Sequence, residues 1–190
     1  MKLIFFGGVK GVGKTTLLAW LKEKYSERIV VLDAGELFRR YHYESNEKTV
    51  QEVEELIVRT LENMPKRSVV AIHWHYAVRH PSGYIPQISY PRLQRIAKSG
   101  FVEEVILLLV QAPINLVYER RLKDTQIKKR ALSRLAVREE VDWEKKLLWE
   151  HYALFSQLLG KKKVSIFRLN NKDLRTAQKH VYALFEKLVT

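Results

Sequence analysis

Five short apolar runs recur along the chain, and longer segments with apolar residues at every third or fourth position lie between them. Several runs are almost unbroken Val, Ile and Leu, which is typical of parallel strands buried on both faces. The longer segments have the spacing of amphipathic helices. Strands that alternate with helices predict an α/β fold, a parallel sheet covered by helices. The predicted strands are 2–6, 28–32, 68–72, 102–110 and 163–169, and the predicted helices are 14–25, 36–43, 47–63, 91–98, 113–122, 132–159 and 172–189.

No repeat, low-complexity linker or change of composition divides the 190 residues, so we expect a single domain, 1–190. Between the predicted strand 68–72 and the predicted helix 91–98, the stretch 83–91 reads "GYIPQISYP" and predicts a long ordered loop. Loops of that length inside a compact domain are usually functional.

The composition excludes several classes of protein. Hydrophobic residues make up 46% and charged residues 29%, as in globular domains. No apolar run approaches the roughly 20 residues that span a bilayer, so we expect no membrane association. The start "MKLIFFGG" is too short for a signal-peptide core and predicts a first strand. The absence of cysteine excludes disulfides and thiolate metal sites and favours a cytoplasmic location.

The net charge of +13 is the most unusual bulk property. A field of that sign attracts polyanions, either nucleotide phosphates or RNA. Charge alone does not choose between these two partners.

A phosphate-binding loop follows the first predicted strand, in "GGVKGVGKTT". It satisfies the pattern G-x-x-x-x-G-K-[ST] between a strand and a helix. Glycines let successive N–H groups converge on an anion at a helix N-terminus. Lys14 can reach the β- and γ-phosphates, and the Thr15 hydroxyl is a hard oxygen ligand for Mg²⁺. The predicted nucleotide-binding residues are Gly8, Val9, Lys10, Gly11, Val12, Gly13, Lys14, Thr15 and Thr16.

Four segments carry a resemblance to a known family: the phosphate loop, "LDAGELFRR" (32–40), "HWHYAVRHPSGYIP" (73–86) and "APINLVYERRLKDT" (112–125). Together they resemble an archaeal-type adenylate kinase. They are also similar to its relative, the nuclear adenylate kinase/ATPase that assists small ribosomal subunit maturation. The resemblance implies a three-layer α/β/α P-loop NTPase fold with a five-stranded parallel sheet of nucleoside monophosphate kinase type. It also implies ATP and Mg²⁺ as cofactors.

The resemblance further implies an acceptor-binding arm at about 34–64 and a lid at about 123–134. The family's R-x-R lid pair is matched here by Lys128-x-Arg130, and a lysine cannot form the bidentate fork of an arginine. The implied catalytic residues are Lys14, Arg120, Arg121, Lys128 and Arg130. The implied acceptor-binding residues are Gly35, Glu36, Arg39, His75, Gly83 and Tyr84.

One position departs from the family pattern. The family has D-x-H after the third strand, and this chain has "HWH" at 73–75. Imidazole is a poor ligand for Mg²⁺, which prefers oxygen. Mg²⁺ could instead be held by Thr15, with Asp33 or Glu36 as an outer carboxylate. Alternatively, His73 and His75 bind a transition metal, or the site binds ATP and catalyses slowly, with the histidines as pocket wall or acceptor contacts.

Aromatic residues recur along 142–155, within the longest predicted helix. Their spacing favours a stripe that faces the core over a platform for stacking bases.

Two functions therefore compete. The first is a kinase that transfers the γ-phosphoryl group of ATP to a nucleoside monophosphate, or to another small molecule on the same fold. The second is an ATPase that acts as a ribosome-assembly or RNA-associated factor. The acceptor-side segment "GELFRR" (35–40), the loop "SGYIP" (82–86) and the candidate lid favour the first, which is the leading hypothesis. The altered "HWH", the altered lid pair and the charge of +13 favour the second.

Overall fold

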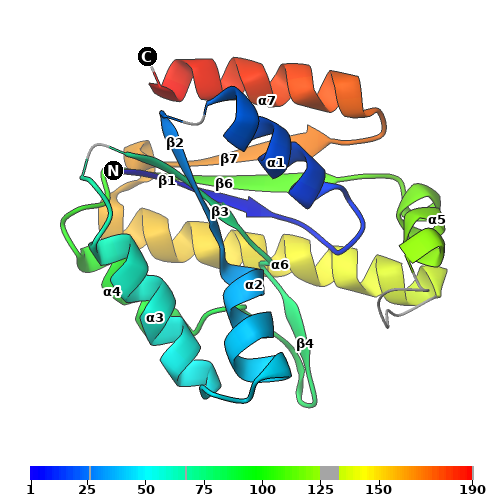
Figure 1. The fold of residues 1–190 in the computed structure, drawn as a ribbon, viewed down its shortest axis with the longest axis horizontal. Helices are drawn as coiled ribbons and strands as arrows, with labels where there is room; N and C mark the ends of the chain where they lie inside the picture. Colours follow the sequence, from blue (N-terminus) through cyan, green and yellow to red (C-terminus); the bar gives the residue numbers. More distant parts are fainter. Residues whose placement is uncertain (26, 67, 125–132, 190) are drawn as a thin grey trace.

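The computed structural model describes residues 1–25, 27–66, 68–124 and 133–189. Its centre is a sheet of five strands in the order β2-β3-β1-β6-β7, in which every neighbouring pair is parallel (Figure 1). The predicted α/β class and all five predicted strands are confirmed, with boundaries moved by one or two residues. The strands are β1 (Lys2–Gly7), β2 (Ile29–Asp33), β3 (Val69–His73), β6 (Glu104–Gln111) and β7 (Val164–Asn170).

Helices cover both faces of the sheet and give three layers (Figure 1). Apolar side chains of α1 and α7 pack on one face, and those of α3, α4 and α6 pack on the other. The helices are α1 (Lys14–Lys24), α2 (Ala34–Phe38), α3 (Val50–Glu62), α4 (Tyr90–Lys98), α5 (Ile114–Asp124), α6 (Arg134–Leu159) and α7 (Leu174–Val189), with a π-helical turn η1 (Arg39–Glu44) and a 3-10 turn η2 (Lys161–Lys163).

The strand register brings the loops that follow the strands to one edge of the sheet. Phe6 of β1 pairs with His73 of β3, and His73 pairs with Asp33 of β2. On the other side, Gly7 pairs with Leu109 of β6. The loop after β1 therefore lies between the end of β3 and the end of β6. In open α/β sheets, ligands bind at this carboxyl edge.

The stretch 83–91 differs from the sequence prediction. Part of it belongs to an antiparallel hairpin of β4 (Val78–His80) and β5 (Gly83–Ile85), and α4 begins at Tyr90. Gly83 has φ 118°, a conformation that favours glycine at the tight turn. The prediction of one long loop was wrong because two strands of three residues are too short to show a periodic pattern.

The predicted helix 36–43 consists of two parts. Asp33 accepts a hydrogen bond from the Glu36 amide and starts α2 earlier than the periodicity indicated, and the π-helical turn η1 continues it. Among the described residues, no helix combines the length and apolar character that crossing a membrane requires.

Candidate functional site

The phosphate loop connects β1 to α1, with Lys14 as the first residue of the helix. Two hydrophobic side chains, those of Val9 and Val12, are 3% and 1% exposed and fix the loop to the core. Gly8 and Gly13 have φ 134° and 91°. A side chain at Gly8 would lie 2.3 Å from the carbonyl oxygen of Val110, so the loop needs glycine for space as well as for its backbone angle.

Lys14 is buried behind the loop. Its Nζ atom donates hydrogen bonds to the carbonyl oxygens of Gly8 and Val9, the second at 3.3 Å. Burial lowers the pKa of Lys14 to about 8, against the opposing effect of the nearby Glu144 carboxylate. The next two residues, Thr15 and Thr16, are exposed on the first turn of α1, where an oxygen ligand for a cation is accessible.

A carboxylate that the sequence reasoning did not select lies in the same region. Glu144, in the middle of α6, is 2% exposed. Its Oε1 atom is 3.1 Å from Nδ1 of His75, and its Oε2 atom accepts a hydrogen bond of 2.8 Å from the Tyr76 amide. Burial raises the pKa of Glu144 to about 8, and the Lys14 charge and backbone amides oppose that rise. The sequence signal for this site was the spacing of four residues between Glu144 and Leu148, because that spacing puts an acidic residue on the buried face of α6.

His75 lies between β3 and the β4–β5 hairpin. Its backbone amide donates to Oε1 of Gln87 at 2.6 Å, and its side chain is 15% exposed. The pKa of His75 is well below the usual value, first because of burial and then because of nearby cations. The ring is therefore neutral at pH 7. The side chains that contribute are those of Lys14, His73, Lys10 and Arg121.

The ends of β2 and β3 are joined by a pair of side chains. Nδ1 of His73 is 2.9 Å from Oδ2 of Asp33, and Oδ1 of Asp33 accepts the Glu36 amide. Burial raises the pKa of Asp33, but the hydrogen bond and electrostatic interaction with His73, together with the Glu36 amide and Arg39, outweigh this effect and lower the pKa below its usual value. Asp33 is thus an ionised carboxylate. Within the described parts of the chain, no cluster of three or more His, Cys, Asp or Glu side chains could hold a metal ion.

The three acceptor-side residues taken from the start of the arm lie in α2 and η1. Arg39 forms ion pairs with Glu36 and, at 3.6 Å, with Glu44, and Arg39 and Glu36 are both about half exposed. Gly35 belongs to α2, and the nearest atom to an added side chain there would be Oδ1 of Asp33, at 3.4 Å. These residues therefore border the Asp33–His73 pair on its exposed side.

The other predicted acceptor residues, Gly83 and Tyr84, are in β5. The Tyr84 ring stacks on Trp143 of α6 with centroids 5.6 Å apart. The Nζ atom of Lys146 lies over the Trp143 ring, 4.4 Å from its centroid. Tyr84 thus fixes the hairpin to α6, the helix that carries Glu144.

The two arginines at the end of α5 have different surroundings. Arg121 is 1% exposed, donates from Nε to the Lys10 carbonyl at 2.9 Å and pairs with Glu140 of α6. Arg120 makes longer contacts of 3.3–3.5 Å with backbone carbonyls of the phosphate loop and of Asn171. Arg121 therefore holds the loop in place, and Arg120 lies at its margin.

Asn171 was not selected from the sequence either. It follows β7, is 2% exposed, and donates from Nδ2 to the carbonyl of Val12 at 2.7 Å. Its backbone amide donates to the carbonyl of Gln111 at 2.7 Å, and its buried Oδ1 atom has no hydrogen-bond partner among the residues that the structure describes. A side chain at Gly13 would lie 2.4 Å from Nδ2. A buried acceptor with no partner, next to the phosphate loop, is suited to a ligand donor.

Lys128, Arg130 and most of the lid at 123–134 lie outside the described residues. Arg134, the first residue of α6, is within them, and its guanidinium lies 5.2 Å from the centroid of the Tyr118 ring.

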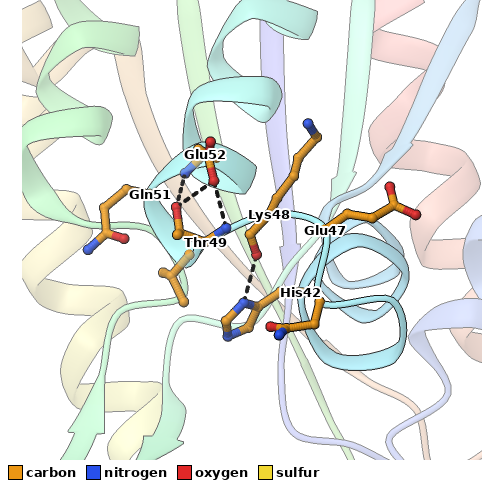
Figure 2. Close-up of a pocket in the computed structure, with 8 residues that line it drawn as sticks. His42, Glu47, Lys48, Thr49, Gln51 and Glu52 are labelled. Carbon is orange, nitrogen blue, oxygen red and sulfur yellow. Dashed lines mark hydrogen bonds between the residues drawn. The ribbon is translucent and has the colours of Figure 1, made fainter.

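A cavity of about 440 Å³ lies on the arm, between η1 and the start of α3 (Figure 2). Thr49 and Glu52 form a capping box at the N-terminus of α3, and Nδ1 of His42 is 2.9 Å from the Lys48 carbonyl (Figure 2). These polar groups already have partners within the arm. The cavity is separate from the phosphate loop, because none of the residues that line it belongs to that loop.

Comparisons with known proteins agree with this geometry. The chain is similar to the YorR protein of Bacillus subtilis, whose crystal structure is in complex with phosphorylated GDP. The identity is 13% and the TM-score is 0.60, over 98% of this chain and 96% of that one. This likeness supports the three-layer α/β/α P-loop fold. No curated protein matches the sequence. A family model described as an AAA domain (AAA_17) matches residues 7–137, and the chain therefore belongs to that family of nucleotide-binding P-loop domains.

Proposed function

We propose that the protein is a phosphotransferase that moves the γ-phosphoryl group of ATP to a nucleoside monophosphate, in the manner of an adenylate kinase. Phosphoryl transfer needs two substrates held in line and cations where negative charge develops. Lys14 supplies one such cation at the centre of the carboxyl edge of the sheet.

One arrangement supports this proposal most strongly: polar groups lie on both sides of the phosphate loop. Asp33, His73 and His75 lie toward β2 and β3. Arg120 and Asn171 lie toward α5 and β7. Because the strand order puts β1 between these sides, the γ-phosphoryl group of a nucleotide on the loop would lie between two binding regions.

The triphosphate nucleotide would occupy the side of Arg120 and Asn171. The buried Oδ1 of Asn171 can accept a hydrogen bond from an amino group of the base, which adenine, guanine and cytosine carry and uracil does not. The monophosphate would occupy the side that α2 and η1 border, where Arg39 is half exposed.

Mg²⁺ fits the groups present. Thr15 offers a hydroxyl at the start of α1, and Asp33 is an ionised carboxylate, 41% exposed, with lone pairs beyond those that its two partners use. When bound, the ion would neutralise charge on the phosphates. In this arrangement His73 is the hydrogen-bond partner of Asp33 and is not a metal ligand.

The second candidate is an ATPase that works with RNA or a ribosomal component. The net charge of +13 and the histidine at position 73 favour it. In that case ATP would be hydrolysed and no monophosphate would be phosphorylated.

The test is incubation with Mg·ATP and a panel of nucleoside monophosphates, with separation of all nucleotide products. We expect a diphosphate of the acceptor to form with the wild type and not with Lys14→Met. Lys22→Met, an exposed change at the far end of α1, is the matched control. Release of phosphate that is stimulated only by RNA, with no phosphorylated acceptor, would instead support the ATPase.

A further inference from the structure

We infer that Glu144, in its ionised form, is a positioning residue that fixes His75 in one tautomer, with the proton on Nδ1 and the lone pair on Nε2. His75 would then meet a bound ligand as a hydrogen-bond acceptor. The ligand part of this inference rests on the proposed function, whereas the tautomer is a property of the protein alone.

The two oxygen atoms of Glu144 have different partners. Oε2 accepts the Tyr76 amide, a group that can only donate. Oε1 is left for Nδ1 of His75 at 3.1 Å. An ionised carboxylate has no proton to donate, so the hydrogen on this contact must be that of the histidine.

Burial raises the pKa of Glu144 to about 8, although the Lys14 charge and the backbone amides of Tyr76 and Ala77 act to lower it. The carboxylate is therefore ionised above this pH, and the Nδ1-protonated tautomer of His75 belongs to that form. Below this pH a proton on Oε1 would donate to Nδ1 of His75 instead.

The Nε2 atom of His75 is available to a ligand. Within the described part of the chain, no hydrogen bond to this atom is formed, and it is not among the buried polar atoms without a partner. The phosphate groups of nucleotides carry little or no proton at neutral pH and could not donate to it. The matching ligand is an O–H donor: water on a bound Mg²⁺ or a sugar hydroxyl of the monophosphate.

The substitution Glu144→Gln tests the tautomer. A glutamine has one acceptor oxygen and one NH₂ group, so it cannot accept from both Tyr76 and His75. With the oxygen kept by the Tyr76 amide, its NH₂ would donate to Nδ1 and shift the proton of His75 to Nε2. Glu54→Gln is the matched control, because Glu54 is also buried and accepts a backbone amide, that of Ser89, away from the phosphate loop.

The measurement is ¹⁵N NMR of histidine side chains in the ligand-free protein at about pH 9.5, above the pKa of Glu144, with His75 assigned by comparison with His75→Asn. We expect the Nδ1-protonated form in the wild type and in Glu54→Gln, and the Nε2-protonated form in Glu144→Gln. An Nε2-protonated wild type would overturn the inference without any variant having to fold. An unchanged tautomer in folded Glu144→Gln would overturn it as well.

Ligands are then added to the wild type. A shift of the Nε2 resonance with Mg²⁺ and a non-hydrolysable ATP analogue, but not with the analogue in EDTA, identifies metal-bound water as the donor. A shift with the monophosphate alone identifies its hydroxyl. No shift with either would overturn the acceptor role, even where phosphotransfer is observed. Where it is observed, we expect kcat to fall about 10- to 100-fold in Glu144→Gln and to be unchanged in Glu54→Gln.

Discussion

The side chain of Asp33 joins the ends of two strands: its Oδ2 atom is 2.9 Å from Nδ1 of His73, while Oδ1 caps α2. The carboxylate that the family pattern puts at the end of the third strand is thus found on the neighbouring strand. This relationship moves the candidate for an outer metal ligand from β3 to β2 and gives His73 a defined partner.

Two substitutions at Asp33 distinguish the effect of its charge from its role as the N-cap of α2. Asparagine caps a helix as well as aspartate does, so Asp33→Asn should unfold at nearly the wild-type denaturant concentration. Asp33→Ala should lose about 1 kcal/mol of the free energy of unfolding. Both variants should need more Mg²⁺ for half-maximal phosphotransfer, which a titration with Mg²⁺ measures. Asp142→Asn, an exposed change on α6, is the control. Unchanged Mg²⁺ dependence in both Asp33 variants would remove Asp33 from the metal site.

Gly7 is predicted to be intolerant of a side chain for reasons of space. A Cβ atom there would lie 2.2 Å from the Tyr76 ring, whose hydroxyl donates to the Phe5 carbonyl at 2.9 Å. Overpacking of this kind costs about 1–3 kcal/mol, so Gly7→Ala should lower the free energy of urea unfolding by that amount. In a Tyr76→Leu background the cost should be much smaller. An equal cost in both backgrounds would show that the ring is not the cause.

Arg121 should affect ATP binding through the loop it holds. Arg121→Met removes hydrogen bonds from a buried guanidinium, and we expect a loss of about 2–3 kcal/mol in stability. Adding Glu140→Leu should restore part of that stability, because it removes the carboxylate left without a partner. The hydrogen bond from Arg121 Nε to the Lys10 carbonyl would be missing in both variants, so the Kd for ATP measured by calorimetry should stay raised in both. A wild-type Kd in Arg121→Met would contradict this role.

His151 should make the fold sensitive to acid. It is fully buried among aromatic rings, and burial lowers its pKa to about 4 from the usual 6.5. The unfolded chain therefore binds the proton first, and stability is fully present above pH 6.5 and falls as the pH drops toward 4. The difference between these two pKa values of His151 predicts that the free energy of unfolding falls by about 2 kcal/mol from pH 7 to pH 5.

The measurement for His151 is urea unfolding of the wild type and of His151→Leu at both pH values. The variant should lose less stability than the wild type over this interval. Equal losses would assign the acid sensitivity to other groups.

The sheet and the phosphate loop were predictable because both depend on patterns among residues that are close together in the sequence. Strands gave unbroken apolar runs, and the loop gave glycines at fixed spacing next to a lysine. Glu144 and Asn171 were not predictable, because their partners lie 69 and 159 residues away in sequence. The periodicity of α6 also assigned Trp149 to the core, and it is 50% exposed. Spacing identifies a helical face approximately, and tertiary packing decides which edge of that face is covered.

The central claim is that two nucleotides bind on opposite sides of the phosphate loop. Calorimetric titration tests it most directly, with a non-hydrolysable ATP analogue and a nucleoside monophosphate each added to the wild type, Arg120→Ala and Arg39→Ala. We expect both ligands to bind the wild type, Arg120→Ala to weaken only the analogue, and Arg39→Ala to weaken only the monophosphate. Binding of the analogue alone, with no monophosphate bound under any condition, would contradict the claim.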